Sequence, residues 1–275
     1  MARKSENHDR TATALESHRD SRLRCHSGIR PLRNQSHNYG FSLIELLIVL
    51  SVASLLLGLL MPGLQRMRKA GWQVACASNE HQMGIAMSLY VDEYGEHMPY
   101  TWFAGTPAEE GGWGRKPEPG KMMTVYRGGQ YSWWDGLGLL FAERYNKDPQ
   151  AFYCPAHRGG HPYSRYETQW NVPDSHSIVG NYHYRGLSGE LKPTHRYKGE
   201  YLRRRWPNMV LMTDGLQTKS DFSHQNGTNV LRIDLSVDWF RDANENIYNR
   251  LPDSGDENGD FGQVWALLDK KNGGR

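Results

Sequence analysis

The chain has 275 residues and a formal net charge of +3, enough length for a membrane anchor and one globular domain with its own core. The charge is unevenly distributed: residues 1–40 hold eight Lys and Arg and four acidic residues, which leaves 25 basic and 26 acidic side chains for the rest. Because the basic excess is confined to the first 40 residues, composition gives no argument for nucleic-acid binding, and we expect none. Lys and Arg ahead of an apolar segment instead favour a cytoplasmic N-terminus.

The first predicted element is an apolar run of 21 residues, 41–61, whose only ionisable side chain is Glu45. As a helix it would be about 31 Å long, which matches the hydrocarbon thickness of a bilayer. It is longer than the apolar region of a secretory signal peptide, and no clear small-residue cleavage site follows it. A carboxylate at mid-bilayer costs roughly 2.5–3.5 kcal/mol on insertion scales, so we expect Glu45 to have a function.

We expect the helix to continue through Pro62, because a proline in a transmembrane helix kinks it rather than ends it, and to run to about residue 95. Apolar residues at three- and four-residue spacing predict that its second half, residues 64–94, is amphipathic and packs against a globular head.

The remaining elements are short. Residues 99–132 are rich in Gly and Pro and are predicted to be a loop, whereas residues 133–145 are predicted to be a short helix. Predicted strands cover residues 151–154, 178–184, 209–213, 230–234 and 236–240, and a helical turn is predicted at 264–268. The expected fold class is therefore α+β: a long N-terminal transmembrane and amphipathic helix followed by a small antiparallel-sheet head.

The segment at the start of the apolar run reads Gly40-Phe41-Ser42-Leu43-Ile44-Glu45. It resembles the N-terminal signal of the type IV pilin and pseudopilin family, which includes the type II secretion pseudopilins. The resemblance implies cleavage by a prepilin peptidase after Gly40, methylation of the new N-terminus Phe41, and alignment of subunits by Glu45, whose carboxylate can neutralise the α-ammonium group of a neighbouring subunit. An ordinary signal anchor that contains a glutamate is the alternative.

This resemblance implies a domain organisation and a location. A basic cytoplasmic leader, a transmembrane helix, its amphipathic continuation and a periplasmic head would cover residues 1–40, 41–62, 63–98 and 99–275. The chain would be a non-enzymatic, single-pass protein of the bacterial inner membrane and a subunit of a pilus-like filament, in particular a type II secretion-like pseudopilus. Its partners would be the prepilin peptidase, other pilin-like subunits and membrane components of a secretion system.

A membrane-tethered envelope protein that uses the signal only for export is an open alternative. Its Trp- and Tyr-rich head would bind a glycan or a protein. A tethered enzyme with a metal site is a third reading.

A second resemblance covers later parts of the chain. A large bacterial subfamily of prepilin-like proteins has a stretch similar to Cys76-Ala-Ser-Asn79-Glu-His-Gln82-Met-Gly84, and also a Tyr-Cys-Pro sequence similar to that around Cys154. That subfamily ends in a histidine, nine residues, and Asp-Gly. This chain offers His224 and Asp234 at that spacing, but Leu235 replaces the glycine.

The cysteines allow two readings. Cys25 lies in the leader, so a mature chain keeps Cys76 and Cys154, which an oxidising compartment would join in a disulfide. The alternative is zinc, because Cys154, His157 and His161 lie within eight residues and Cys76 could supply a fourth ligand.

Two further groups of residues have a chemical and a structural reading. Asp253, Asp256 and Asp260 could gather around Ca²⁺, although their spacing does not match an EF-hand loop, and a solvated polar turn is preferred. His224 could form an acid–base pair with Asp234 or Asp214. No nucleophile elbow is present, so we predict a structural histidine near a hairpin, no catalytic residue and no cofactor.

Overall fold

The computed structural model describes residues 40–104, 117–130, 132–173, 175–186, 204, 207–224, 226–254 and 259–270. The leader that the sequence predicts, with Cys25, lies outside these residues apart from Gly40. By its internal contacts the chain divides into two units, Met1–Ala53 and Ser54–Arg275. Helix α1 (Leu43–Glu93) belongs to both, because the division falls within it.

The long helix is present as predicted, and it remains helical through Pro62. Its first part exposes its large apolar side chains, among them Leu47, Leu56 and Leu60. Within the part of the chain that the structure describes, α1 is the one helix long and apolar enough to cross a membrane. Apolar side chains on every face of a helix require lipid or other helices around them.

The second part of α1 is amphipathic, as predicted. Its buried residues recur every three or four positions and so form one face: Cys76, Glu80, Met83, Met87 and Tyr90. This face contributes to the main hydrophobic core of the head. After Glu93 the chain leaves the helix with positive φ at Gly95 and Glu96, a common way for helices to end.

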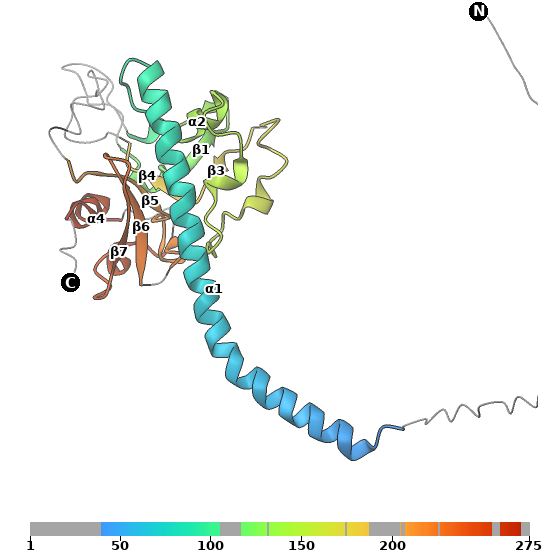
Figure 1. Cartoon of the computed structure of the whole chain (residues 1–275). Coiled ribbons are helices and arrows are strands. Elements are labelled where there is room, and N and C mark those ends of the chain that lie inside the picture. Colours follow the sequence, from blue (N-terminus) through green and yellow to red (C-terminus); the bar gives the residue numbers. More distant parts are fainter. Residues whose placement is uncertain are drawn as a thin grey trace, which may run out of the picture. The chain divides into compact units, whose positions relative to one another are not determined.

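The head contains two antiparallel sheets (Figure 1). The first has the order β2-β1-β3 and is built from Trp133–Trp134, Thr124–Arg127 and Ile178–Val179. The second has the order β4-β5-β6-β7 and is built from Tyr182–Tyr184, Val210–Asp214, Gly227–Arg232 and Val237–Arg241. Among the described residues the head also has the short helices α2 (Gly138–Ala142) and α4 (Phe261–Leu268). The α+β class is therefore confirmed.

Single 3-10 turns connect these elements. They are η1 to η6, at Trp102–Ala104, Pro119–Lys121, Pro149–Phe152, Tyr163–Arg165, Lys219–Asp221 and Tyr248–Arg250.

The four-stranded sheet lies between two cores. On the side of α1, Leu231 of β6 packs so closely on the helix that a Cβ at Gly84 would lie 2.9 Å from its Cδ1 atom. The other core joins Val210 and Val230 to the apolar face of α4, including Trp265. Both cores are needed because every residue of β5 and β6 is buried.

Three sequence predictions of local structure are wrong. The predicted helix at 133–145 begins as strand β2, because Trp133 and Trp134 pair with β1, and only Gly138–Ala142 is helical. The predicted strand at 151–154 is instead the end of the turn η3, whose start is capped by Asp148. The predicted loop at 99–132 contains β1. In the first and third cases, pairing with another strand outweighs the local sequence preference.

The predicted strand at 178–184 is divided into two short strands in different sheets. Ile178–Val179 pairs with β1, whereas Tyr182–Tyr184 pairs with β5. Asn181 lies between them, and its main-chain N–H donates to Phe152 O instead of to a sheet partner. The hairpin predicted from residues 230–240 is present as β6 and β7.

Candidate functional site

The start of α1 is held by a reciprocal pair of hydrogen bonds. The Ile44 N–H donates to Ser42 Oγ at 3.3 Å, and the Ser42 N–H donates to Glu45 Oε2 at 2.8 Å. This is the capping arrangement that a Ser-x-x-Glu sequence provides, and it satisfies two main-chain donors that have no partner within the helix. Glu45 therefore closes the first turn of α1 besides carrying a charge. The Ser-x-x-Glu spacing was the sequence signal for this role.

Gly40 and Phe41 precede the helix in an exposed segment. The Phe41 side chain is 85% exposed, and a Cβ added at Gly40 would meet no atom within 4 Å. The chain's own structure therefore places no steric demand for glycine at position 40. A steric requirement for glycine at this position can therefore come only from a partner that binds the segment.

The comparisons with known proteins identify this segment. Residues 35–61 match the family model described as "Prokaryotic N-terminal methylation motif". The chain carries a prepilin-type methylation motif. The motif supports a pilin-like subunit, consistent with a type IV pilin-like protein that a prepilin peptidase processes and that assembles with similar subunits. The match ends at residue 61, so it gives no support to the C-terminal signature around His224. No curated protein and no solved structure matches the chain significantly.

In the head, Cys76 of α1 forms a disulfide with Cys154, across a sequence separation of 78 residues. The two Cα atoms lie 5.2 Å apart, within the range that a disulfide needs. Both cysteines are buried. The bond thus ties the long helix to the segment that follows η3.

Two polar side chains lie against this disulfide. His224 Nε2 is 3.5 Å from Cys154 Sγ and 3.4 Å from Asp214 Oδ2. Asp214 is the last residue of β5, and Asn229 of β6 donates to its Oδ2 from the main chain at 2.9 Å and from the side chain at 3.1 Å. We call Cys76, Cys154, Asp214 and His224 the disulfide cluster.

Burial governs the charges of these groups. It raises the pKa of Asp214 to about 7, although hydrogen bonds from Asn229 and Thr228 offset a part of this effect. It lowers the pKa of His224 to about 4. It also raises the pKa of Glu80 on α1 well above its usual range, and the nearby Asp214 adds to that rise. His224 is therefore neutral at neutral pH, and its contact with Asp214 lacks the opposite charges of a salt bridge.

The candidate zinc ligands from the sequence, Cys154, His157 and His161 with Cys76, do not gather at one site. His157 Nε2 lies 3.7 Å from Asp221 Oδ1, and its Nδ1 lies 3.5 Å from Ser223 Oγ. His161 Nδ1 lies 2.6 Å from the hydroxyl of Tyr166. The histidines thus have other partners, and Cys154 is bonded to Cys76, as in the disulfide reading of the sequence.

Of the two candidate partners of His224, Asp234 is not the one that the structure brings to it. Asp234 accepts hydrogen bonds from the main chain and side chain of Ser236, in the turn between β6 and β7. The histidine's carboxylate partner is Asp214, the other candidate.

The three proposed calcium ligands are in different settings. Asp253 accepts a hydrogen bond from Lys219 at 2.9 Å, and Asp260 accepts one from the Gln263 N–H at the start of α4. Asp256 lies outside the described residues.

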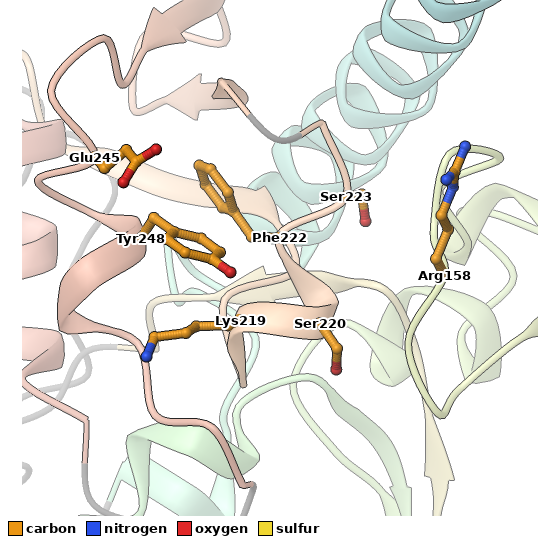
Figure 2. A pocket seen from close by; sticks show the side chains of 7 residues that line it. All are labelled: Arg158, Lys219, Ser220, Phe222, Ser223, Glu245 and Tyr248. Atoms are coloured by element: carbon orange, nitrogen blue, oxygen red, sulfur yellow. The ribbon is translucent and has the colours of Figure 1, made fainter.

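A cavity of about 350 Å³ opens beside the turn η5 (Figure 2). Its lining combines two cationic side chains, one carboxylate, three hydroxyls and two aromatic rings: Arg158, Lys219, Ser220, Phe222, Ser223, Glu245 and Tyr248. Lys219 also pairs with Asp253 at 2.9 Å. Such a lining suits an anionic or hydroxyl-rich ligand.

Ser223, in the wall of this cavity, lies near His157, which in turn lies near Asp221, so the residue types of a serine–histidine–aspartate set are present. Ser223 Oγ, however, donates to the main-chain oxygen of Asp221 at 2.9 Å, and its distance to His157 Nδ1 is 3.5 Å. Burial lowers the pKa of His157 to about 4. The hydroxyl proton is thus directed toward a carbonyl rather than toward a base, which gives no support to nucleophilic catalysis.

Proposed function

We propose that the chain is a subunit of a pilus-like filament, in particular a type II secretion-like pseudopilus, and that it catalyses nothing itself. The observation that carries this proposal is the methylation motif at residues 35–61, placed on a helix whose apolar side chains are exposed on all sides. In the precursor these side chains would be covered by lipid. In a filament they would be covered by the same helix of neighbouring subunits.

The geometry at the start of α1 supports a double role for Glu45. Its Oε2 atom accepts the Ser42 N–H within the same helix. An ionised carboxylate has about four acceptor positions, so this capping bond leaves room for a second donor. Cleavage after Gly40 would create an α-ammonium group on Phe41, and in a neighbouring subunit that group would be the second donor. The pairing would set the register between helices whose apolar contacts are not directional.

The proposed topology follows from the same features. A leader over residues 1–40 with eight basic residues would stay in the cytoplasm, α1 would cross the inner membrane, and the head would lie in the periplasm. An exported head is also the setting in which the Cys76–Cys154 disulfide would form.

Processing is tested by the intact mass of the protein from the membrane fraction. We expect a chain that begins at Phe41 and carries one additional methyl group, and we expect Gly40→Val to remain uncut. Gly58→Val is the matched control, because a Cβ at either glycine meets nothing within 4 Å of the chain itself. A mature chain that begins after residue 61 would exclude the pilin-like reading.

Assembly is tested by crosslinking in the native envelope and identification of the partners. Glu45→Gln keeps an acceptor for the Ser42 N–H but removes the charge, whereas Ser42→Ala removes the other half of the cap and keeps the charge. We expect Glu45→Gln to lose crosslinks to other pilin-like subunits and Ser42→Ala to retain them. Wild-type crosslinking by Glu45→Gln would contradict the pairing of charges between subunits.

A membrane-tethered envelope binding protein is the second candidate. The cavity of Figure 2 favours it, because Arg158, Lys219 and Tyr248 offer cationic and aromatic contacts to an acidic glycan or protein. Unchanged secretion and assembly in a Glu45→Val strain, together with glycan binding that Arg158→Ala abolishes, would favour this candidate over the filament subunit.

A further inference from the structure

We propose that the disulfide cluster is a zinc site under redox control. When a dithiol reduces the bond between Cys76 and Cys154, the two thiolates, His224 and Asp214 bind one Zn²⁺. The proposal is independent of the filament function, because it concerns the head alone.

The positions of the four ligand atoms fit a tetrahedral ion. Each side chain of the disulfide cluster offers one atom, and all four atoms lie within 4.8 Å of one another. Zinc bonds of about 2.0–2.3 Å give edges of roughly 3.3–3.8 Å between ligand atoms in a tetrahedron. Cys154 Sγ to His224 Nε2 measures 3.5 Å, and His224 Nε2 to Asp214 Oδ2 measures 3.4 Å. Two edges of the tetrahedron are therefore already formed; the two sulfur atoms must move apart, and the other three distances lie within 4.8 Å.

The surroundings hold the ligands in place. Asn229 donates twice to the carboxylate of Asp214, and the ring of Trp239 meets the imidazole of His224 edge-on. Such outer contacts fix ligand orientation at metal sites. The other carboxylate oxygen, Asp214 Oδ1, is buried and has no hydrogen-bond partner among the described residues.

The site is assembled by folding and not by neighbouring residues in the sequence. Its ligands come from α1, from the segment after η3, from the end of β5 and from the turn before β6. All are buried or nearly so, which excludes competing water. Two thiolates and an imidazole favour zinc over magnesium or calcium, which prefer oxygen ligands.

The chemistry balances with a dithiol as the reductant. The S–S bond breaks, Cys76 and Cys154 become thiols, and the dithiol becomes a disulfide. Zn²⁺ then binds as two protons leave the thiols for solvent, so the ion is held by two thiolates, a neutral imidazole and a carboxylate. Oxidation by a small disulfide reverses both steps and releases the ion. Either state, disulfide or zinc, would link α1 to the rest of the head.

Cobalt titration tests the proposal. The probe is Co²⁺, added to the full chain in detergent. The chain carries Cys25→Ser, so that Cys76 and Cys154 are its only two cysteines. After reduction by a dithiol and its removal, we expect one Co²⁺ per chain, with thiolate-to-metal charge transfer and the intense visible bands of a tetrahedral ion. We expect Zn²⁺ to displace it, and we expect no such bands from the oxidised chain.

Two variants identify the ligands. His224→Gln should weaken binding at least about tenfold, since even the loss of an outer partner of a metal site costs 10–100-fold. His81→Gln, a matched change at an exposed position on α1, should bind as the wild type does. Near-UV circular dichroism checks that the His224→Gln head is folded.

A measurement on the chain without further substitution keeps the proposal testable if His224→Gln does not fold. The ¹¹³Cd resonance of the reduced chain reports the number of thiolate ligands, and we expect two. The proposal is overturned if the reduced chain gives no thiolate–cobalt band, if fewer than two thiolates bind cadmium, or if a folded His224→Gln binds as tightly as the wild type.

Discussion

His183 makes a prediction about pH that follows directly from its position. It lies in β4 with no exposed surface, and its ring is 5.2 Å from the ring of Phe261 and 5.6 Å from that of Trp265, both on α4. Burial lowers the pKa of His183 to about 3, and a contact with the main chain of Pro119 offsets only a part of this effect. His183→Phe keeps an aromatic ring against α4 and removes the titrating group.

The sign and size of the effect follow from proton linkage. Above the ordinary histidine pKa of about 6.5 the side chain is neutral in both the folded and the unfolded chain. As the pH falls below that value, the unfolded chain binds a proton that the folded chain does not, so the free energy of unfolding falls by about 1.4 kcal/mol per pH unit until the folded pKa is reached. At pH 5 the loss relative to pH 8 is roughly 2 kcal/mol.

The assay is chemical denaturation of the full chain in detergent at pH 8 and at pH 5, with tryptophan fluorescence as the measure of unfolding. Other buried histidines also lower the stability at pH 5, so the informative quantity is the difference between wild type and His183→Phe at each pH. The larger ring of phenylalanine also changes the packing, but this contribution to the free energy of unfolding is the same at both pH values and cancels in the comparison. We expect the wild type to lose about 2 kcal/mol more than the variant between pH 8 and pH 5. Equal losses would refute the reasoning about His183.

Two further predictions concern the stability of the head. Replacing both Cys76 and Cys154 by serine opens a loop with a sequence separation of 78 residues, and on the chain-entropy model the free energy of unfolding should fall by about 4–5 kcal/mol, or less where the unfolded chain keeps structure. Unchanged denaturation midpoints would contradict this. Gly138→Ala should cost more than about 3 kcal/mol, because the added Cβ would overlap the main-chain oxygen of Val125. Gly160→Ala, whose Cβ meets nothing within 4 Å, is its control, and equal stabilities would show that the backbone can adjust.

The sequence by itself determined the long N-terminal helix and the motif at its start. The apolar run of residues 41–61 needs no tertiary partner to be recognised, because a helix satisfies its own main-chain hydrogen bonds and its length can be compared with a bilayer. The motif around Gly40 and Glu45 could be recognised for the same reason, since its residues are contiguous in the sequence. The hairpin of β6 and β7 was also local, since two strand-like runs lie on either side of a tight turn.

Only the tertiary structure decided which distant residues meet. The sequence offered Asp234 and Asp214 as partners of His224 and could not choose between them; the fold brings Asp214 to the histidine, together with Cys154, which the sequence did not connect with it. Trp133 and Trp134 join a strand although their surroundings favour a helix, because pairing with β1 determines their conformation. Contacts of this kind depend on how sheets and helices pack, and a residue's spacing along the chain carries little information about them.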